Sequence, residues 1–400
     1  MQRVEGSPGI RLAQARGTGR RIHEAAYRTA RFLLVPFFKQ YLRVEADPQP
    51  SLPAPYVVVA NHVTELDFFF AAAVFRAPMT FVAGEALLRV KILGWLLTRV
   101  FGCIVKQKGA ADARTTMGML RRLREGRNVC LFAEGNTTFD GRTNPIPEAT
   151  GAMLRAVGAG LVTCRIEGGY FTMPRWGKGI RRGRTAVRVA GTYTREQLQA
   201  MGTEDINALL QRDLREDAYD RQGRDMTPFR GKNPAGGIDR VLYLCPKCKG
   251  QSTLSGEGDL VTCSACGVLA RYTEYGTFEG DKPFHGIREW ADWQKEELRR
   301  LAGEPGAEAI LRDAAQRLSV HGADGELTPV AEGTMEMGRG SLRVGGFAAP
   351  LPDIVGLEVY RRNTLQFTLK DGRHFEAVPS EGFNALKYRD LYRILKGLAG

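Results

Sequence analysis

Residues 56–70 read YVVVANHVTELDFFF and place a histidine and an aspartate at the end of an apolar run. His62 and Asp67 are five residues apart, about 500° on an α-helix, so they cannot share one helix face. They can meet if His62 lies in the turn after a strand and Asp67 lies in the following helix, which Asn61 or Thr64 can cap. The carboxylate would then bind one ring nitrogen and leave the other free as a general base toward a substrate hydroxyl.

This spacing is common by chance, and a lone pair of this kind is more often a histidine hydrogen-bonded near a strand end. Here Asn61 directly precedes His62, a valine-rich run comes before them, and an apolar helix follows. The context therefore favours catalysis over the structural alternative.

The chain around this motif alternates between apolar runs of strand length and helical stretches. Helices are predicted over residues 111–125 and 148–157, and a basic amphipathic helix interrupted by Pro36 is predicted over 21–44. Short strands alternating with helices predict an α/β domain, layered around a central mixed sheet, over residues 21–230. The predicted strands are residues 56–60, 80–83, 103–106, 128–133, 161–166 and 185–190.

Four ordered motifs in this region resemble those of the glycerolipid acyltransferases, the family that includes 1-acylglycerol-3-phosphate acyltransferase. The motifs are NHVTELD at 61–67, GCIVKQK at 102–108, FAEGNTT at 132–138 and LVTCRIEGG at 161–169. Their order and spacing make the resemblance specific over residues 21–222. It implies that His62, oriented by Asp67, removes the proton of a lysolipid hydroxyl. The oxygen then attacks the thioester of an acyl-CoA or an acyl carrier protein.

The resemblance also implies which residues bind the substrates, because the third motif of the family holds the glycerol backbone and the headgroup phosphate. The predicted substrate-binding residues are Glu134, Gly135, Asn136, Lys106, Lys108 and Asn61.

Two of the motifs depart from the family pattern at phosphate-binding positions. Thr137 stands where the third motif has an arginine, so one bidentate phosphate ligand is missing, and Lys108 replaces an arginine in the second. A lysine can hold phosphate only as a point charge. The acceptor headgroup therefore stays open, whereas acyl transfer itself is still predicted. The segment PRWGKGIRRGR at 174–184 either supplies headgroup contacts anchored by Trp176 or is a solvated loop.

Four of the seven cysteines form the pattern C-x2-C-x14-C-x2-C; they are Cys245, Cys248, Cys263 and Cys266. Four thiolates satisfy a tetrahedral Zn²⁺ with no open position, so the pattern predicts a structural zinc ribbon over residues 241–276. Iron with the same ligands, or a redox pair, is the alternative. The ribbon has no basic face with interleaved aromatic residues, so we expect no nucleic-acid binding.

The rest of the chain reads as an arm and two further segments. Residues 1–20 are predicted to be a disordered basic arm, and residues 285–325 a helical linker. Residues 326–400 predict a small β-rich domain that ends in a helix and resembles PH- or GRAM-type lipid-binding folds. Within it, Asp371 and Gly372 stand between two alternating runs and predict a hairpin turn.

The net charge of +13 indicates anionic partners, and we expect an anionic membrane surface among them. No stretch reaches the roughly 18–20 uncharged apolar residues of a membrane span, and the amino terminus shows no secretory signal. We therefore expect a cytoplasmic protein that associates peripherally with a membrane.

These observations together predict a lysophospholipid O-acyltransferase with a structural Zn²⁺. Its expected substrates are a lysolipid such as 1-acylglycerol-3-phosphate and an acyl thioester, carried either by CoA or by acyl carrier protein as a partner. Two alternatives remain: acylation of another lysolipid or a glycolipid, and a non-catalytic membrane lipid-binding protein. The intact pair of His62 and Asp67 argues against the second alternative.

Overall fold

The computed structural model describes residues 17–84, 95, 98, 101–106, 113–280, 283–305, 308–322, 326–378, 380 and 382–398. Lys108 and the first sixteen residues of the predicted arm lie outside this part of the chain. The first helix, α1 (Gly17–Tyr41), begins four residues before its predicted start and continues through Pro36.

The first half of the chain forms a seven-stranded sheet in the order β1-β7-β6-β2-β5-β3-β4. Neighbouring strands run parallel except β6 and β7, which are antiparallel. The predicted mixed sheet is therefore confirmed. Its strands are β1 (Val44–Ala46), β2 (Tyr56–Ala60), β3 (Met79–Gly84), β4 (Ile104–Lys106), β5 (Asn128–Phe132), β6 (Gly160–Glu167) and β7 (Thr185–Tyr193).

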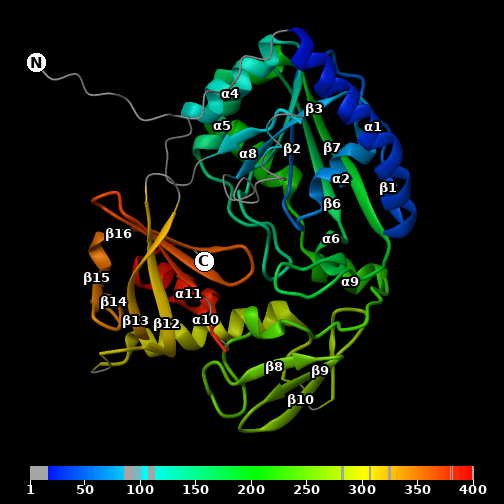
Figure 1. Cartoon of the computed structure of the whole chain (residues 1–400). Coiled ribbons are helices and arrows are strands. Elements are labelled where there is room, and N and C mark those ends of the chain that lie inside the picture. The colour runs from blue at the N-terminus through cyan, green and yellow to red at the C-terminus, as the bar shows by residue number, and fades with distance from the viewer. Residues whose placement is uncertain are drawn as a thin grey trace, which may run out of the picture.

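Helices cover both faces of this sheet (Figure 1). All five residues of β2 are buried, and alternate ones belong to two separate apolar clusters, because successive strand side chains point to opposite faces. One cluster packs against α1 and α2, and the other against α4, α5, α7 and α8. The helices are α2 (Asp67–Val74), α4 (Ala113–Arg124), α5 (Ala149–Val157), α6 (Gly169–Thr172), α7 (Arg195–Ala200), α8 (Thr203–Leu214) and α9 (Ala218–Asp225).

Helix α1 is fixed to the carboxyl end of α2 by polar contacts. The Tyr27 hydroxyl donates to the carbonyl of Phe75, and Arg31 Nε donates to the carbonyls of Ala72 and Phe75. The last carbonyls of a helix have no partner within the helix, so these donors satisfy them. Phe38 stacks on Phe69 with ring centroids 4.1 Å apart.

The second half of the chain forms two further sheets, which confirms the predicted fold class of a ribbon and a β-rich domain. A four-stranded antiparallel sheet contains β8 (Leu254–Glu257), β9 (Leu260–Cys263), β10 (Gly267–Tyr272) and β11 (Phe278–Glu279). After α10 (Ile287–Gly303), seven antiparallel strands follow in the order β15-β14-β13-β12-β18-β17-β16, and α11 (Ala385–Leu395) packs against β16 and β17. The strands are β12 (Leu311–His321), β13 (Leu327–Met337), β14 (Ser341–Val344), β15 (Phe347–Pro350), β16 (Ile354–Tyr360), β17 (Thr364–Leu369) and β18 (His374–Val378).

Asp371 and Gly372 lie in the turn between β17 and β18, which pair as an antiparallel hairpin, as predicted. Figure 1 shows this sheet on the left, with α10 running beneath it toward the ribbon.

Candidate active site

The turn after β2 brings His62 and Asp67 into direct contact. His62 Nδ1 lies 2.7 Å from Asp67 Oδ2, and Asp67 is the first residue of α2. The Asp67 carboxylate also accepts hydrogen bonds from the amides of Val63 and Thr64. Because these partners all donate to the carboxylate, Nδ1 carries the proton and Nε2 is left as the basic nitrogen. The His62 side chain is 23% exposed and that of Asp67 is 1% exposed, so the base can meet a ligand while its orienting carboxylate stays dry.

Burial raises the pKa of Asp67, and hydrogen bonds from the His62 ring and the amides of Thr64 and Val63 oppose that rise. These donors compensate the cost of burying a carboxylate. They also fix its orientation relative to the imidazole.

The start of α2 is not capped as the sequence suggested. Its N-cap residue is Leu66, which offers no capping side chain. Thr64 Oγ1 accepts a hydrogen bond from the Leu66 amide, while both polar atoms of the Asn61 side chain bond to the backbone of Ile166. Asn61 is fully buried, so it joins the first motif to the strand of the fourth. The prediction of a cap failed because the Asn61 amide meets a neighbouring strand before it can reach the helix.

Glu134 follows β5 and joins two segments of the chain: the turn after β2 and the far end of the loop that carries the third motif. Its Oε1 accepts from the His62 amide at 2.6 Å, and its Oε2 accepts from the Asn144 amide at 2.6 Å. Burial raises its pKa to about 8, against the two amide bonds that lower it. The amide of Thr138 donates to the carbonyl of His62, so a second hydrogen bond joins the loop to the turn after β2.

Gly135 and Asn136 follow Glu134 at the surface of this loop. Gly135 is exposed, has a φ of +71°, and a side chain there would meet nothing within 4 Å. The Gly135 amide itself donates to the carbonyl of Phe132, so an anion would have to bind other backbone amides of this loop. The Asn136 carbonyl accepts from the Asn144 side chain, and the Asn136 side chain is partly exposed.

The second motif lies at the edge of the sheet. Lys106 is the last residue of β4, and β5 and β3 separate β4 from β2, or about 14 Å across the sheet. The structure describes the backbone of Lys106, and Lys108 lies outside the described residues. The role of Lys106 and Lys108 in substrate binding therefore stays a prediction.

One aromatic side chain stacks on the histidine, and another on α2 is exposed. The His62 ring stacks on Phe132 with centroids 4.7 Å apart, and Phe68 on α2 is 42% exposed. Phe132 was within a recognised motif, but the stacking depends on the parallel pairing of β2 and β5. Asn144 was not predicted, and nothing in the local sequence distinguishes it from other loop asparagines.

The interfacial anchor predicted for Trp176 in segment 174–184 is wrong. Trp176 is fully buried and donates its indole N–H to the Tyr170 hydroxyl, so it cannot anchor at a membrane interface. Arg175 and Arg181 are also buried, and only Lys178, Arg182 and Arg184 of the five cations are exposed. Burial and the neighbouring charge of Arg389 lower the pKa of Arg175 to about 9. The segment was misread because its apolar contacts come from residues far along the chain.

The four predicted cysteine ligands converge at one end of the ribbon. Their sulfurs all lie within 4.8 Å of one another, with 3.9 Å between Cys245 and Cys266 and 3.8 Å between Cys248 and Cys263. A tetrahedral zinc ion with bonds of about 2.3 Å requires sulfurs about 3.8 Å apart. The arrangement is therefore compatible with zinc.

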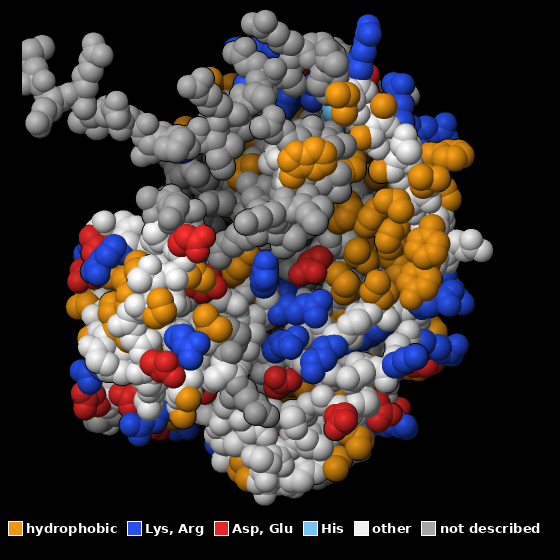
Figure 2. Space-filling model, viewed as in Figure 1, with side chains coloured by type: hydrophobic (Ala, Val, Ile, Leu, Met, Phe, Trp, Pro, Cys, Tyr) orange, Lys and Arg blue, Asp and Glu red, His pale blue; other side chains and the backbone are white. Residues whose placement is uncertain are grey.

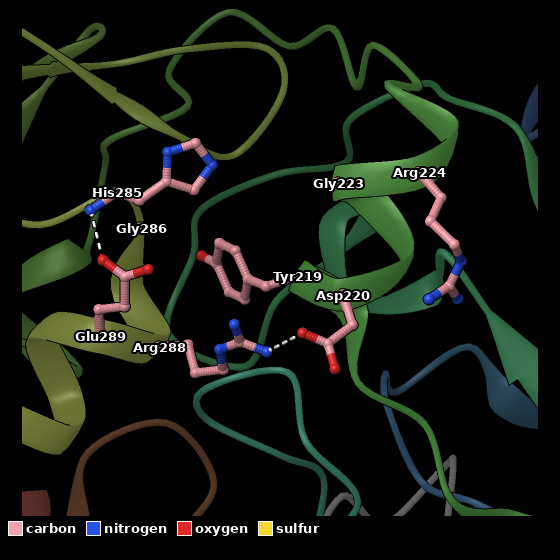
Figure 3. A pocket seen from close by; sticks show the side chains of 8 residues that line it. All are labelled: Tyr219, Asp220, Gly223, Arg224, His285, Gly286, Arg288 and Glu289. Atoms are coloured by element: carbon pink, nitrogen blue, oxygen red, sulfur yellow. Dashed lines mark hydrogen bonds and ion pairs between the residues drawn. The ribbon is translucent and has the colours of Figure 1, made fainter.

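A separate cavity of about 370 Å³ lies between α9 and the start of α10 (Figure 3). Its charged lining is largely self-paired, since Arg288 contacts Asp217 and Asp220, and Glu289 accepts from the His285 amide. It shares no residue with the His62 site.

Comparison with known proteins agrees with the motifs. Residues 43–167 match the family model described as Acyltransferase. The chain is 27% identical over 193 residues to a lyso-ornithine lipid O-acyltransferase of Pseudomonas aeruginosa, covering 47% of this chain and 62% of that protein. It is 28% identical over 160 residues to an uncharacterized acyltransferase of Schizosaccharomyces pombe, covering 38% of this chain and 56% of that protein.

A solved structure is also similar: the 1-acyl-sn-glycerophosphate (LPA) acyltransferase PlsC from Thermotoga maritima. The match has a TM-score of 0.37 and 16% identity, and it covers 49% of this chain and 87% of the PlsC chain. The chain spans less than two thirds of the length of either curated relative. The matched region contains His62, Asp67 and the third-motif loop. Through this region, the chain is similar to the acyltransferase family.

Proposed function

We propose that this protein is an O-acyltransferase that esterifies the hydroxyl of a lysolipid. His62 Nε2 removes the hydroxyl proton, and the oxygen attacks the carbonyl carbon of an acyl thioester. The C–S bond then breaks, and the leaving thiolate takes the proton from the imidazolium. The observation that carries the proposal is the contact of 2.7 Å between His62 Nδ1 and the buried Asp67, because it fixes the base and leaves Nε2 free.

The first candidate acceptor is 1-acylglycerol-3-phosphate or another lysophospholipid. The open, exposed position of Gly135 within the third motif leaves room for an anionic headgroup. The acyl donor is an acyl-CoA or an acyl carrier protein, since either delivers the thioester that the reaction needs.

A lysolipid without phosphate is a second candidate, and two observations favour it. Thr137 supplies no guanidinium where the third motif of the family has an arginine. The curated relative from Pseudomonas aeruginosa is named as acting on a lyso-ornithine lipid. An acceptor panel separates the two candidates.

We also propose that the protein binds peripherally to an anionic membrane surface on the cytoplasmic side. No helix in the described ranges combines the length and apolarity of a membrane span. Helix α1 nevertheless exposes Phe32, Leu33 and Phe37, which are 77%, 62% and 58% exposed. Figure 2 shows apolar side chains gathered over α1 and α2, with Lys and Arg side chains beside them. An apolar strip bordered by cations is typical of helices that lie in the membrane interface.

The cysteine cluster is proposed to hold one structural Zn²⁺, with Cys245, Cys248, Cys263 and Cys266 as ligands. A bound zinc would cross-link the ribbon and would not take part in the reaction, because four thiolate ligands leave no open coordination position.

The proposal is tested by acyl transfer in liposomes with the purified full chain. Acyl-CoA or acyl carrier protein would be offered with a panel that includes lysophosphatidate and lyso-ornithine lipid, beside His62→Ala and Asp67→Asn. We expect transfer to one acceptor class, reduced about 10²- to 10⁴-fold without the base. Arg373→Ala, an exposed change in the distant β17–β18 hairpin, is the control. Transfer that survives His62→Ala would place the active site elsewhere.

A further inference from the structure

The third-motif loop is held by residues that lie far outside the matched acyltransferase region. The Arg175 side chain donates three hydrogen bonds to backbone carbonyls. Nη1 bonds to Thr137 in the loop at 3.0 Å, Nη2 to Val359 at 2.5 Å and Nε to Arg361 at 2.7 Å. Val359 belongs to β16 and Arg361 to the turn after it, so one buried guanidinium joins the loop to the C-terminal sheet.

A second contact joins the same loop to α10. Arg142 forms a bidentate pair with Asp292, with distances of 2.6 and 3.1 Å, and also contacts Asp140. Lys295 on α10 lies 3.8 Å from Asp140. Bidentate pairing fixes direction as well as distance, so α10 sets where this part of the loop lies.

The ring of Phe139 adds a third contact from the same side. The guanidinium of Arg175 lies 4.3 Å from the ring centroid, and that of Arg389 on α11 lies 5.6 Å from it. Phe139 is buried. Its neighbour in sequence, Thr138, donates its amide to the carbonyl of His62.

We propose that Arg175 and Asp292 are positioning residues for acyl transfer, which hold the acceptor-binding loop against the C-terminal half of the chain. The proposal rests on the acyltransferase function and on the loop's role in binding the acceptor. According to this proposal, Arg175 and Asp292, which lie outside the residues matched by the family model, contribute to the affinity for the acceptor. Loosening either contact widens the positions the loop can adopt, so a bound acceptor must restrict them again.

The test compares Asp292→Ala and Arg175→Lys with the full wild-type chain. A lysine keeps the charge of Arg175, but its donors sit on one nitrogen and cannot reproduce the three separate nitrogens of the guanidinium that reach these carbonyls. We expect the acceptor KM to rise about threefold in Asp292→Ala, a partly exposed ion pair, and about tenfold in Arg175→Lys. The KM for the acyl donor and kcat at saturating acceptor should stay within about twofold, and Asp292→Glu should restore the acceptor KM.

Asp259→Ala is the matched control, because it breaks an exposed pair with Arg271 on the ribbon that does not touch the loop. Amide hydrogen exchange over residues 137–144 provides a readout that does not depend on activity. We expect faster exchange there in Asp292→Ala and Arg175→Lys but not in Asp259→Ala.

Unchanged loop exchange in both variants would overturn the proposal. Faster amide exchange in the loop with an unchanged acceptor KM would show that the two contacts hold the loop but do not position it for the acceptor. If the wild-type chain transferred no acyl group while loop exchange still rose, the acyltransferase function would fail, and with it the role in catalysis. The structural link between the loop and the C-terminal half would then stand alone.

Discussion

Glu134 occupies a position that the family resemblance assigns to the acceptor, yet both of its carboxylate oxygens bind backbone amides of His62 and Asn144. It is 7% exposed, so little of it can reach a ligand in this arrangement. Geometry therefore favours a role in holding the catalytic turn and the loop together.

Replacing Glu134 with Gln tests this role. The ionised Glu134 side chain accepts from both amides, whereas glutamine has one acceptor oxygen. Above pH 8, where Glu134 is ionised, one of the two backbone donors must therefore face an N–H group in the variant and lose its bond. Losing one buried hydrogen bond predicts a fall in kcat of about tenfold, with the acceptor KM nearly unchanged. Steady-state kinetics with varied acceptor would check it, and a large rise in KM with normal kcat would instead identify Glu134 as a headgroup ligand.

The same variant has a predicted pH signature. The pKa of Glu134 is raised from 4.5 to about 8, so above pH 4.5 the unfolded chain loses this proton while the folded chain keeps it. Stability of the wild type relative to Glu134→Gln should therefore be highest near pH 4.5 and fall as the pH approaches 8. Denaturant midpoints of the two proteins at pH 5 and pH 8 would show whether the difference has this sign.

At the scale of elements, helix α1 has two apolar sides with different roles. Val35 and Tyr27 are buried against the domain and Phe38 stacks on Phe69, whereas Phe32 and Phe37 face outward. The sequence pattern alone did not separate these roles, because the whole stretch 32–38 is apolar.

Replacing Phe32 and Phe37 removes the outward side of α1, and it also removes the contacts of Phe37 with Phe38 and Tyr41. Phe32→Ser with Phe37→Ser should reduce binding to anionic liposomes by at least about tenfold, since each buried phenylalanine contributes about 1.5–3 kcal/mol. Val355→Ser, which removes another exposed apolar side chain from the C-terminal sheet, is the matched control. Liposome sedimentation with a thermal melt would measure both effects, and unchanged partitioning would count against α1 as the membrane contact.

At the scale of the whole molecule, the ribbon packs against α10 and α11 instead of standing apart. Trp290 Nε1 donates to the carbonyl of Leu244, and Gln294 bonds to the amide of Tyr243. Lys387 on α11 is fully buried and reaches Ser252 in the ribbon and Asp313 in β12. The domain limits predicted near residues 230 and 326 stay predictions, and these polar contacts cross them.

Loss of the metal should therefore be felt beyond the ribbon. We expect Cys263→Ser to release zinc, to lower Tm and to reduce acyl transfer, because α10 and α11 hold the third-motif loop. Cys164→Ala, which removes a buried cysteine of β6, should keep one zinc per chain. Metal analysis with calorimetry would decide, and a Cys263→Ser protein that retained one equivalent of zinc would contradict the four-thiolate site.

The sequence alone predicted the local features of this protein. The strands and helices follow from periodicities of a few residues, and β2 agrees with its predicted limits. The contact between His62 and Asp67 and the four converging cysteines also depend on one short turn or on two paired turns. Such features are set by backbone geometry within a short segment, so spacing is enough to predict them.

Only the tertiary structure decided which polar side chains are buried and what they bind. From the sequence, Trp176 and Arg175 were expected in an exposed basic loop. In the structure, β16, the ribbon and neighbouring aromatic side chains enclose them. Arg142 and Asp292 form an ion pair across 150 positions of sequence. Burial depends on which distant surfaces pack together, and no local period in the sequence records that choice.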